Sequence, residues 1–374
     1  MRFIAVVALL CFASATFAAP ATRPTALDRI RVSDDKTHFV LAGSKARVVM
    51  WGFNYDRDDA GRLIEDYWAD EWATVEQDFR EMRDLGGNVV RVHLQFGRFM
   101  RSPDEPDAEN LKRLARLVKL AGDVGLYLDV TGLGCYHKKD VPAWYAALGE
   151  ADRWSAQANF WKAVAGVCKG SPAVFCYDLM NEPIVGGPDP KDDWLPGEPL
   201  GGKHFVQRIT LDAKGRTSEQ VAKAWIATLT AAVRSVDDTT LVTVGVIPWA
   251  QVFKGAKPVF YSPEACGPLD FVAVHFYPNA APLEETLAAL KVYDVGKPMV
   301  IEEIFPLGAG VEKTAEFIKR SGTLVDGYVS FYWGKTIDEN RKKGDVNGAL
   351  VAAWLEKFRS MSPHAAGAGA GAEK

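Results

Sequence analysis

Short apolar runs alternate with longer amphipathic stretches along most of the chain. The runs have the length and β-branched character of buried strands, and the stretches between them repeat apolar residues at helical spacing. The clearest predicted helices cover 74–86, 109–125 and 217–236. The predicted strands cover 47–55, 88–94, 126–131, 173–180, 240–246, 270–277, 298–303 and 326–333.

Glycines mark the ends of several predicted helices, at Gly86, Gly125 and Gly170, because a residue that tolerates positive φ closes the last turn. Eight strands, nearly all followed by a helix, predict a closed (β/α)₈ TIM barrel. The fifth unit is the weakest, since 249–267 has little helical periodicity. Before the first barrel strand, 30–49 alternates around two turns, which predicts a β-hairpin that closes the N-terminal floor of the barrel.

The two ends of the chain differ in composition from the rest. Residues 1–19 combine one positive charge with an apolar stretch and two final alanines, which is typical of a secretory signal peptide and too short for a membrane span. The Ala/Gly-rich tail at 363–374 is a low-complexity segment that we expect to be disordered. The sequence therefore predicts a secreted or periplasmic protein with a single domain over 26–362.

Charge and cysteine content narrow the possible partners. The chain has 44 Lys and Arg against 48 Asp and Glu, and their interspersion argues against a nucleic acid or an anionic membrane as partner. Four cysteines follow the signal peptide and match no zinc-binding spacing. We expect small buried side chains, with one structural disulfide as the alternative, and a monomer. These cysteines are Cys135, Cys168, Cys176 and Cys266.

Polar and aromatic residues stand at most of the predicted strand ends. Chemistry in this fold collects at the C-terminal ends of the strands, and polar side chains are costly inside a barrel unless they face a polar site. Their convergence is hard to explain as packing and predicts a functional site. The residues are Asn54, Tyr55, Arg91, His93, Asn181, Glu182, Trp249, His275, Tyr277, Glu303 and Trp333.

Two of these residues are glutamates that end apolar strands. Glu182 stands within Asn181-Glu182-Pro183, and Glu303 ends the run 297–303. A double-displacement hydrolase needs two carboxyl groups, one that moves a proton and one that attacks carbon. The barrel prediction brings the two together, because all strand ends meet at one mouth.

The five strongest motifs occur in barrel order. They are an arginine on strand two, Asn-Glu-Pro after strand four, His-x-Tyr on six, a glutamate after seven and a tryptophan after eight. Over roughly residues 28–360 this set resembles the retaining glycoside hydrolases of clan A, most closely family 5, the cellulase and mannanase family. The resemblance implies hydrolysis of a β-linked glucan or mannan, or of oligosaccharides from one, with no metal and no organic cofactor.

The resemblance also assigns roles to individual residues. Glu182 takes the acid/base role and Glu303 the nucleophile role. Asn181 would hydrogen-bond the 2-hydroxyl of the sugar, a contact that strengthens in the transition state. Tyr277 and Arg91 would hold the Glu303 carboxylate ionised.

Further residues receive supporting roles or stay open. His275 would lie near the acid/base, and Trp333 would form the sugar platform in subsite −1. Glu302 adjoins Glu303, and strand alternation lets only one of them face the barrel interior. We therefore assign Glu303 and leave Glu302 as a supporting or buried, paired residue. His93 is either a core histidine or part of the site.

Substrate specificity should come from the loops. Asn54, Trp249 and Trp194 are candidate substrate-binding residues, and the insertion 184–215 is too long for an ordinary loop, which suggests a lid or a subsite wall. Whether the enzyme acts within chains or at their ends stays open. Other loop tryptophans fit either sugar stacking or helix packing. These are Trp68, Trp72, Trp144 and Trp154.

One departure from the family pattern bears on the substrate. In many cellulase-like members strand three ends with a histidine, whereas here Asp129 is followed by Val130 and Thr131, and the nearest histidine, His137, lies in the loop. This difference favours mannan-type or short oligosaccharide substrates over cellulose.

Three alternatives compete with a retaining hydrolase. A non-catalytic carbohydrate-binding barrel would keep the tryptophans but gain nothing from converging glutamates. A transglycosylase would use the same two glutamates. A metal-dependent barrel hydrolase typically needs His-x-His early in the chain, and the six histidines offer no such pair.

Overall fold

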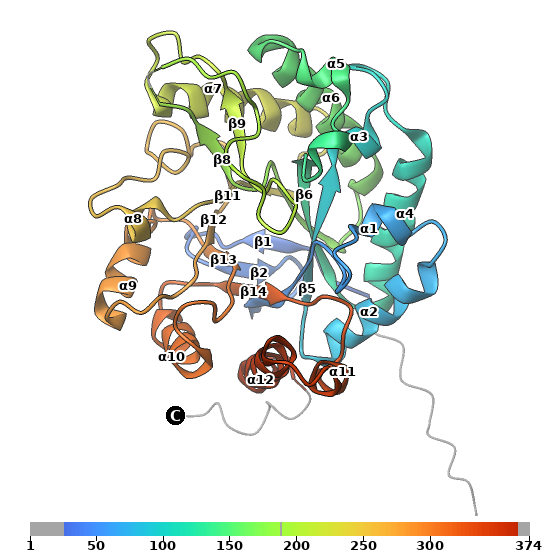
Figure 1. Ribbon diagram of the computed structural model, residues 1–374, viewed down its shortest axis with the longest axis vertical. Coiled ribbons are helices and arrows are strands. Elements are labelled where there is room, and N and C mark those ends of the chain that lie inside the picture. Colours follow the sequence, from blue (N-terminus) through green and yellow to red (C-terminus); the bar gives the residue numbers. More distant parts are fainter. Residues whose placement is uncertain (1–25, 188, 366–374) are drawn as a thin grey trace, which may run out of the picture.

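The computed structural model describes residues 26–187 and 189–365, and it shows the predicted barrel with helices around a ring of parallel strands (Figure 1). The predicted signal peptide at 1–19 lies outside the described residues. All eight predicted strands form. They are β4 (Met50–Tyr55), β5 (Val89–Gln95), β6 (Tyr127–Gly134), β7 (Val174–Asp178), β10 (Leu241–Thr243) with β11 (Gly245–Val246), β12 (Val272–His275), β13 (Met299–Glu303) and β14 (Gly327–Phe331).

The fifth barrel strand is interrupted at Val244. Its first half, β10, pairs in parallel with β7, and its second half, β11, pairs in parallel with β12. At the break the Tyr261 hydroxyl donates a hydrogen bond to the Val244 carbonyl at 2.6 Å. The two halves together complete the ring, because every other barrel strand pairs with its neighbours on both sides.

Helices cover the outside of the ring. The predicted helices at 74–86, 109–125 and 217–236 are confirmed within a few residues, and Gly125 closes one of them at a φ of 83°. The fifth unit contains a single helical turn, as its weak periodicity predicts. The helices are α1 (Ile64–Tyr67), α2 (Trp72–Asp84), α3 (Phe96–Phe99), α4 (Ala108–Val124), α5 (Ala143–Ala146), α6 (Glu150–Cys168), α7 (Ser218–Arg234), α8 (Trp249–Val252), α9 (Leu283–Lys291), α10 (Val311–Ser321), α11 (Ile337–Lys342) and α12 (Val346–Met361), with a 3₁₀ turn η1 (Lys138–Asp140).

The N-terminal segment closes the floor of the barrel, as predicted. The expected hairpin has gained a third strand, giving an antiparallel sheet of β1 (Ile30–Val32), β2 (Phe39–Leu41) and β3 (Arg47–Val48). In Figure 1 the strands β1 and β2 cross the centre of the ring. Phe39 packs edge-on against Phe175 and Phe271 at centroid distances of 5.2 and 5.3 Å. This apolar plug leaves the opposite, C-terminal mouth for polar chemistry.

The described C-terminal residues extend the domain slightly beyond the predicted boundary at 362. The ring of His364 contacts the backbone carbonyl of Val49 at 2.8 Å, so the prediction that disorder begins at residue 363 is wrong for the first residues of the tail. Residues 366–374 lie outside the described part of the chain.

The four cysteines of the barrel domain are all buried and free. This confirms the prediction of small buried side chains and contradicts the alternative of a structural disulfide. Within residues 26–187 and 189–365, no helix is long and apolar enough to cross a membrane.

Candidate active site

Arg91 on β5 is the centre of the polar cluster inside the barrel. Its guanidinium is fully buried and donates hydrogen bonds to Glu303 Oε1 at 2.8 Å and to Asp178 Oδ2 at 2.7 Å. The side-chain oxygens of Asn54 and Asn181 each accept a further bond at 3.0 Å. A buried guanidinium needs several acceptors to offset its desolvation, and here they come from three segments: β4, β13, and β7 with the residues directly after it. Arg91 thereby fixes the relative positions of these segments.

Glu303 ends β13 and is bound at both carboxylate oxygens. Arg91 reaches Oε1, and the Tyr277 hydroxyl donates to Oε2 at 2.6 Å. The side chain is 12% exposed. A carboxylate held by two donors, one of them cationic, has a fixed orientation and an electrostatic environment suited to negative charge. The partners of Glu303 expected from the resemblance, Tyr277 and Arg91, therefore do meet it.

Glu182 follows β7 in an unusual backbone conformation. Its φ is +47°, in the left-handed region that residues with a Cβ rarely occupy. The Glu182 backbone amide donates to the Gly245 carbonyl at 2.9 Å, and the side-chain amide of the neighbouring Asn181 donates to the Phe205 carbonyl at 2.9 Å. Backbone strain of this kind concentrates at functional sites. The conformation supports a functional role for the Glu182 side chain, which is 18% exposed.

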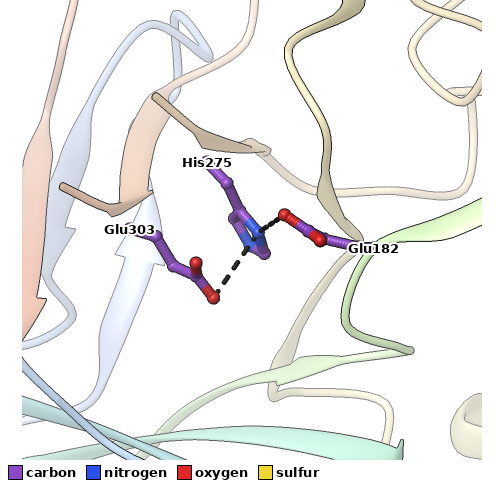
Figure 2. Close-up of side chains that lie close together, drawn as sticks. All are labelled: Glu182, His275 and Glu303. Atoms are coloured by element: carbon purple, nitrogen blue, oxygen red, sulfur yellow. Dashed lines mark hydrogen bonds and ion pairs between the residues drawn. The ribbon is translucent and has the colours of Figure 1, made fainter. Parts of the chain in front are cut away.

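His275 lies between the two glutamates (Figure 2). Its Nδ1 atom is 2.9 Å from Glu182 Oε1 and 3.5 Å from Glu303 Oε1. One oxygen of each glutamate and a ring nitrogen of His275 all lie within 4.8 Å of one another. The structure thus brings the two strand-end glutamates together across the barrel mouth, with His275 beside the predicted acid/base.

The surroundings of His275 favour its protonated form. Burial would lower the pKa of His275, but the negative charge of Glu303 and the hydrogen bonds to Glu182 and Glu302 together raise it to about 10. Full burial leaves the ring no access to water that could screen these charges.

This raised pKa predicts how stability depends on pH. A histidine with a folded-state pKa near 10 and an unfolded pKa of about 6.5 stabilises the fold fully below the lower value and loses that contribution as pH rises through the higher one. We therefore expect the free energy of unfolding to fall more between about pH 6 and about pH 9 in the wild type than in His275→Asn. Urea unfolding at both pH values measures this difference. An equal fall in the free energy of unfolding in the two proteins would contradict the prediction.

Both adjacent glutamates of β13 face the interior, which corrects the expectation that only one does. Val274 pairs with Ile301, but the next residue, His275, pairs with Glu303. Glu302 is therefore the extra residue of a β-bulge, and a bulge interrupts the alternation of side chains. Glu302 is fully buried, and its Oε2 lies 3.5 Å from Arg91 Nη2. The prediction that Glu302 is a buried, paired residue is confirmed.

Asn54 and His93 are structural members of the cluster. The Asn54 amide donates to the carbonyls of Glu302 and Ser330, both at 2.8 Å, while its oxygen accepts from Arg91. Few of its polar positions are left for a sugar, so the structure argues against Asn54 as a substrate contact. His93 bonds to Asn54 and to the Tyr136 hydroxyl. Burial is the largest cause, and the positive charge of Arg91 the next, that holds the pKa of His93 well below its usual value. His93 is therefore a neutral core histidine.

Trp333 follows β14 and joins an aromatic cluster beside the site. Its ring stacks with Phe331 at 5.4 Å and tilts against Phe305 at 5.3 Å. The Arg57 guanidinium lies 5.1 Å from the ring centroid. Trp333 is only partly buried, so some of its surface stays open.

The loop tryptophans divide into packing residues and one exposed residue. Trp194 is buried and stacks with the Arg153 guanidinium at 4.3 Å, so the prediction that it binds substrate is wrong. Trp249 is 36% exposed and stacks with Phe253 at 5.9 Å. Of the four tryptophans that fit either sugar stacking or helix packing, Trp144 is half-buried and the other three are buried: Trp68, Trp72 and Trp154.

The insertion 184–215 is fixed to the barrel at several points. Its two ends pair in parallel as β8 (Pro183–Val185) and β9 (Gln207–Thr210). Lys138 forms an ion pair with Asp193 at 2.9 Å, and the Trp154 indole donates to the Ile209 carbonyl at 2.7 Å. These contacts favour a fixed wall over a freely moving lid.

Sequence reasoning missed two buried carboxyl groups, Asp129 on β6 and Asp178 on β7. Asp178 accepts from Arg91, from Thr131 at 2.9 Å and from the Gly245 amide at 2.8 Å. The signal was present in the sequence, because an aspartate within an otherwise apolar strand must find polar partners.

Comparison with known proteins identifies the family. Residues 41–304 match the model for Cellulase (glycosyl hydrolase family 5). The chain belongs to glycoside hydrolase family 5. It is therefore an O-glycosyl hydrolase, and the alternative of a non-catalytic carbohydrate-binding barrel is not supported. The search of curated proteins found no match.

Solved structures share the fold of this family 5 enzyme at low sequence identity. The β-1,4-mannanase of the sea hare Aplysia kurodai aligns with a TM-score of 0.60 and 17% identity over 90% of this chain and 98% of its own. The β-mannanase of the blue mussel Mytilus edulis gives 0.61 and 18% over 91% and 98%. The exo-β-1,4-mannosidase Op5Man5 of Opitutaceae bacterium strain TAV5 gives 0.63 and 19% over 89% of this chain but 62% of its own, so the chain spans less than two thirds of that protein.

Proposed function

We propose that this family 5 enzyme is a retaining β-glycosidase that works by double displacement. The observation that carries the proposal is the proximity of the two glutamates, which each place a carboxylate oxygen within 4.8 Å of the other. Retaining glycosidases hold their carboxyl groups about 5–5.5 Å apart, whereas inverting ones leave about 6.5–9.5 Å for a water molecule. The spacing in this site favours direct attack by a carboxylate.

The two glutamates have separate roles in the proposed reaction. Glu303 attacks the anomeric carbon while Glu182 protonates the departing glycosidic oxygen, and a glycosyl ester forms on Glu303. Glu182 then accepts a proton from water, which attacks the same carbon and releases Glu303. Arg91 and Tyr277, bound to the two Glu303 oxygens, support its negative charge before attack and after release.

Three neighbouring residues complete the proposed sugar site. Asn181 stands next to Glu182, and its amide would reach the 2-hydroxyl of the sugar, where hydrogen bonding strengthens in the transition state. Trp333 offers an aromatic surface to the apolar face of a pyranose ring. His275 fixes the orientation of Glu182 through the 2.9 Å contact.

For the substrate we propose β-linked mannan or mannooligosaccharides, with β-linked glucan as the alternative. Two observations support mannan. Strand β6 lacks the histidine found there in many cellulase-like members, and the similar structures are named as mannanases and a mannosidase. A product-sizing assay on mannan, glucan, xylan and aryl glycosides tests the choice, and preferential cleavage of glucan would overturn it.

The stereochemistry of the first product tests the mechanism. During hydrolysis of a β-mannoside followed by NMR, we expect the β-anomer to appear first and the α-anomer only by later mutarotation. Initial release of the α-anomer would show single displacement and would contradict the assignment of Glu303 as nucleophile.

Trp249 is the best-placed residue for an aglycone-side contact. It lines a pocket of about 130 Å³ with Val185 and with Pro183, which directly follows Glu182. Loss of an aromatic stacking contact worth about 0.5–1.5 kcal/mol should raise KM about 2- to 12-fold. We expect this rise for Trp249→Ala with long oligosaccharides and no change with a short aryl glycoside. Val346→Ala, an exposed apolar residue on α12, is the matched control; an equal rise for both substrates would argue against the subsite.

We expect activity to be independent of metal ions. Glu182, His275 and Glu303 are close enough to bind a cation, but both Glu303 oxygens accept bonds from protein donors and His275 Nδ1 faces Glu182. Treatment with EDTA followed by assay in metal-free buffer should leave kcat/KM unchanged. Loss of activity that added divalent ions restore would contradict this expectation.

We also propose that the enzyme is exported. The signal-peptide pattern at 1–19 carries this proposal, and the cleavage site is predicted near Ala18 or Ala19. N-terminal sequencing of the protein recovered from outside the cytoplasm tests it, and retention of Met1 in that protein would overturn it.

A further inference from the structure

A pair of buried carboxyl groups lies behind His275 and has no part in the reaction described above. Asp129 on β6 is 1% exposed and Glu302 on β13 is fully buried. Their side chains are within hydrogen-bonding contact of each other. A hydrogen bond between two carboxyl groups requires a proton on one of them.

The oxygens of this pair lack other partners. Among the described residues, no donor reaches either oxygen of Asp129 or Oε1 of Glu302. The remaining oxygen, Glu302 Oε2, lies 3.5 Å from Arg91 Nη2 and 3.4 Å from His275 Nε2. Buried carboxylate oxygens without donors are costly, and a proton shared between Asp129 and Glu302 removes that cost at two of these three atoms.

Charge balance in the barrel interior leads to the same conclusion. Arg91 and protonated His275 supply two positive charges, and Asp178 and Glu303 already supply two negative charges against them. Two adjacent buried carboxylates cannot both ionise without strong repulsion, so one of them retains a proton.

The pKa shifts indicate which group holds the proton. Burial and the neighbouring Glu302 charge raise the pKa of Asp129 well above its usual value. Burial would also raise the pKa of Glu302, but Arg91 and His275 bring it below its usual value. Asp129 is therefore the protonated member and Glu302 the ionised one.

Gly245 makes room for the contact between Glu302 and His275. A Cβ atom at this position would lie 2.4 Å from Glu302 Oε2 and 2.6 Å from His275 Nε2. The break in the fifth strand thus brings a residue without a side chain to the place where the two groups meet.

We propose that protonated Asp129 donates a hydrogen bond to ionised Glu302, and that the Glu302 carboxylate acts as a positioning residue that holds His275 charged and aligned on Glu182. The chain of contacts runs from Asp129 through Glu302 and His275 to Glu182. The step from His275 to Glu182 rests on the proposed function, in which Glu182 is the acid/base. The position of the proton between Asp129 and Glu302 does not rest on it.

Other ionisable groups also face this chain. Three carboxylates and two bases surround His275, and two aspartates, a cation, a thiol and a phenol surround Glu302. Those around His275 are Glu182, Glu302, Glu303, Arg91 and His93. Those around Glu302 besides His275 are Asp129, Asp178, Arg91, Cys176 and Tyr261.

Two substitutions distinguish the members of the pair. Asp129→Asn replaces a neutral acid by a neutral amide that still donates, so the charge beside Glu302 is unchanged. Glu302→Gln removes a negative charge 3.4 Å from His275, and loss of a nearby negative charge lowers the pKa of a cation. If Asp129 were ionised, its substitution would instead resemble that of Glu302.

The test is an NMR titration of selectively labelled histidines in the full chain, with His275 assigned by loss of its signal in His275→Asn. We expect His275 to stay protonated to the same pH in the wild type and Asp129→Asn, and to titrate at least about one unit lower in Glu302→Gln. Equal lowering in both variants, or none in Glu302→Gln, overturns the proposal. The titration does not measure activity, so its outcome can be distinguished from a failure of the proposed function.

A second measurement covers the case in which Glu302→Gln does not fold. In infrared spectra at neutral pH, the difference between the wild type and Asp129→Asn should contain the C=O stretch of one protonated carboxylic acid, lost in the variant. An unchanged spectrum in Asp129→Asn overturns the proposal. In the active enzyme, the basic limb of the kcat/KM profile should move to lower pH in Glu302→Gln and stay in place in Asp129→Asn.

Discussion

Glu303→Ala should lower kcat/KM by at least about 10⁴-fold, since loss of a nucleophile leaves only binding and the remaining electrostatics to act. The substitution removes the group that would form the covalent intermediate and leaves Arg91 and Tyr277 without their shared acceptor. Initial rates on a β-mannoside measure the effect, and unfolding curves confirm that the variant is folded.

The matched control for this substitution is Glu285→Ala. Glu285 is an exposed glutamate in the first turn of α9. Its substitution changes the net charge by the same amount as Glu303→Ala and leaves the site intact. We expect wild-type kcat/KM for this variant. Near-normal activity in folded Glu303→Ala would rule out Glu303 as the nucleophile.

Glu182→Ala should depend on the leaving group. General acid–base catalysis contributes about 10²–10⁴-fold, so a substrate with a poor leaving group should lose at least that much. An aryl glycoside with an activated leaving group needs no proton to depart, so its intermediate forms and then accumulates because water has no base. Added azide needs no base and should raise turnover by attacking the intermediate.

The product of the azide reaction distinguishes the two glutamates. Attack by azide on an intermediate carried by Glu303 should give the β-glycosyl azide, the configuration of the substrate. Rescue of Glu303→Ala, by contrast, would come from direct displacement and give the α-azide. Absence of any azide effect on folded Glu182→Ala, or an α-azide from it, would contradict the acid/base assignment.

Much of the fold was predictable because its signals are local. Eight apolar runs and the glycines that follow the helices mark the barrel units, and the low periodicity of 249–267 agrees with the single turn of α8. The glutamates, with Arg91 and Tyr277, were predictable because strand ends in this fold share one mouth. That Arg91 and Tyr277 contact Glu303 was expected from the family resemblance.

The features that were mispredicted depend on tertiary register. Alternation places Glu302 and Glu303 on opposite faces, and only the pairing of His275 with Glu303 reveals the bulge that turns both inward. Trp194 was expected to contact substrate because it lies in a long insertion, but the way the insertion packs on α6 buries it against Arg153. No spacing in the sequence encodes either outcome.

Asn54 shows a related limit. A polar residue at a strand end can face a ligand or bind the protein, and residue type does not distinguish the two. The carbonyls that occupy its amide belong to Glu302 and Ser330, on two other strands. Its role follows only when β4, β13 and β14 are placed side by side.

The most direct test of the central claim is to trap the covalent intermediate. Incubation with a 2-deoxy-2-fluoro β-glycoside carrying an activated leaving group slows both steps, and hydrolysis of the ester most, because fluorine destabilises the oxocarbenium-like transition states. Digestion and mass spectrometry should then find one fluorosugar per chain on the peptide that contains Glu303, and none in Glu303→Ala. A label on another residue, or full inactivation without a label, would contradict the account.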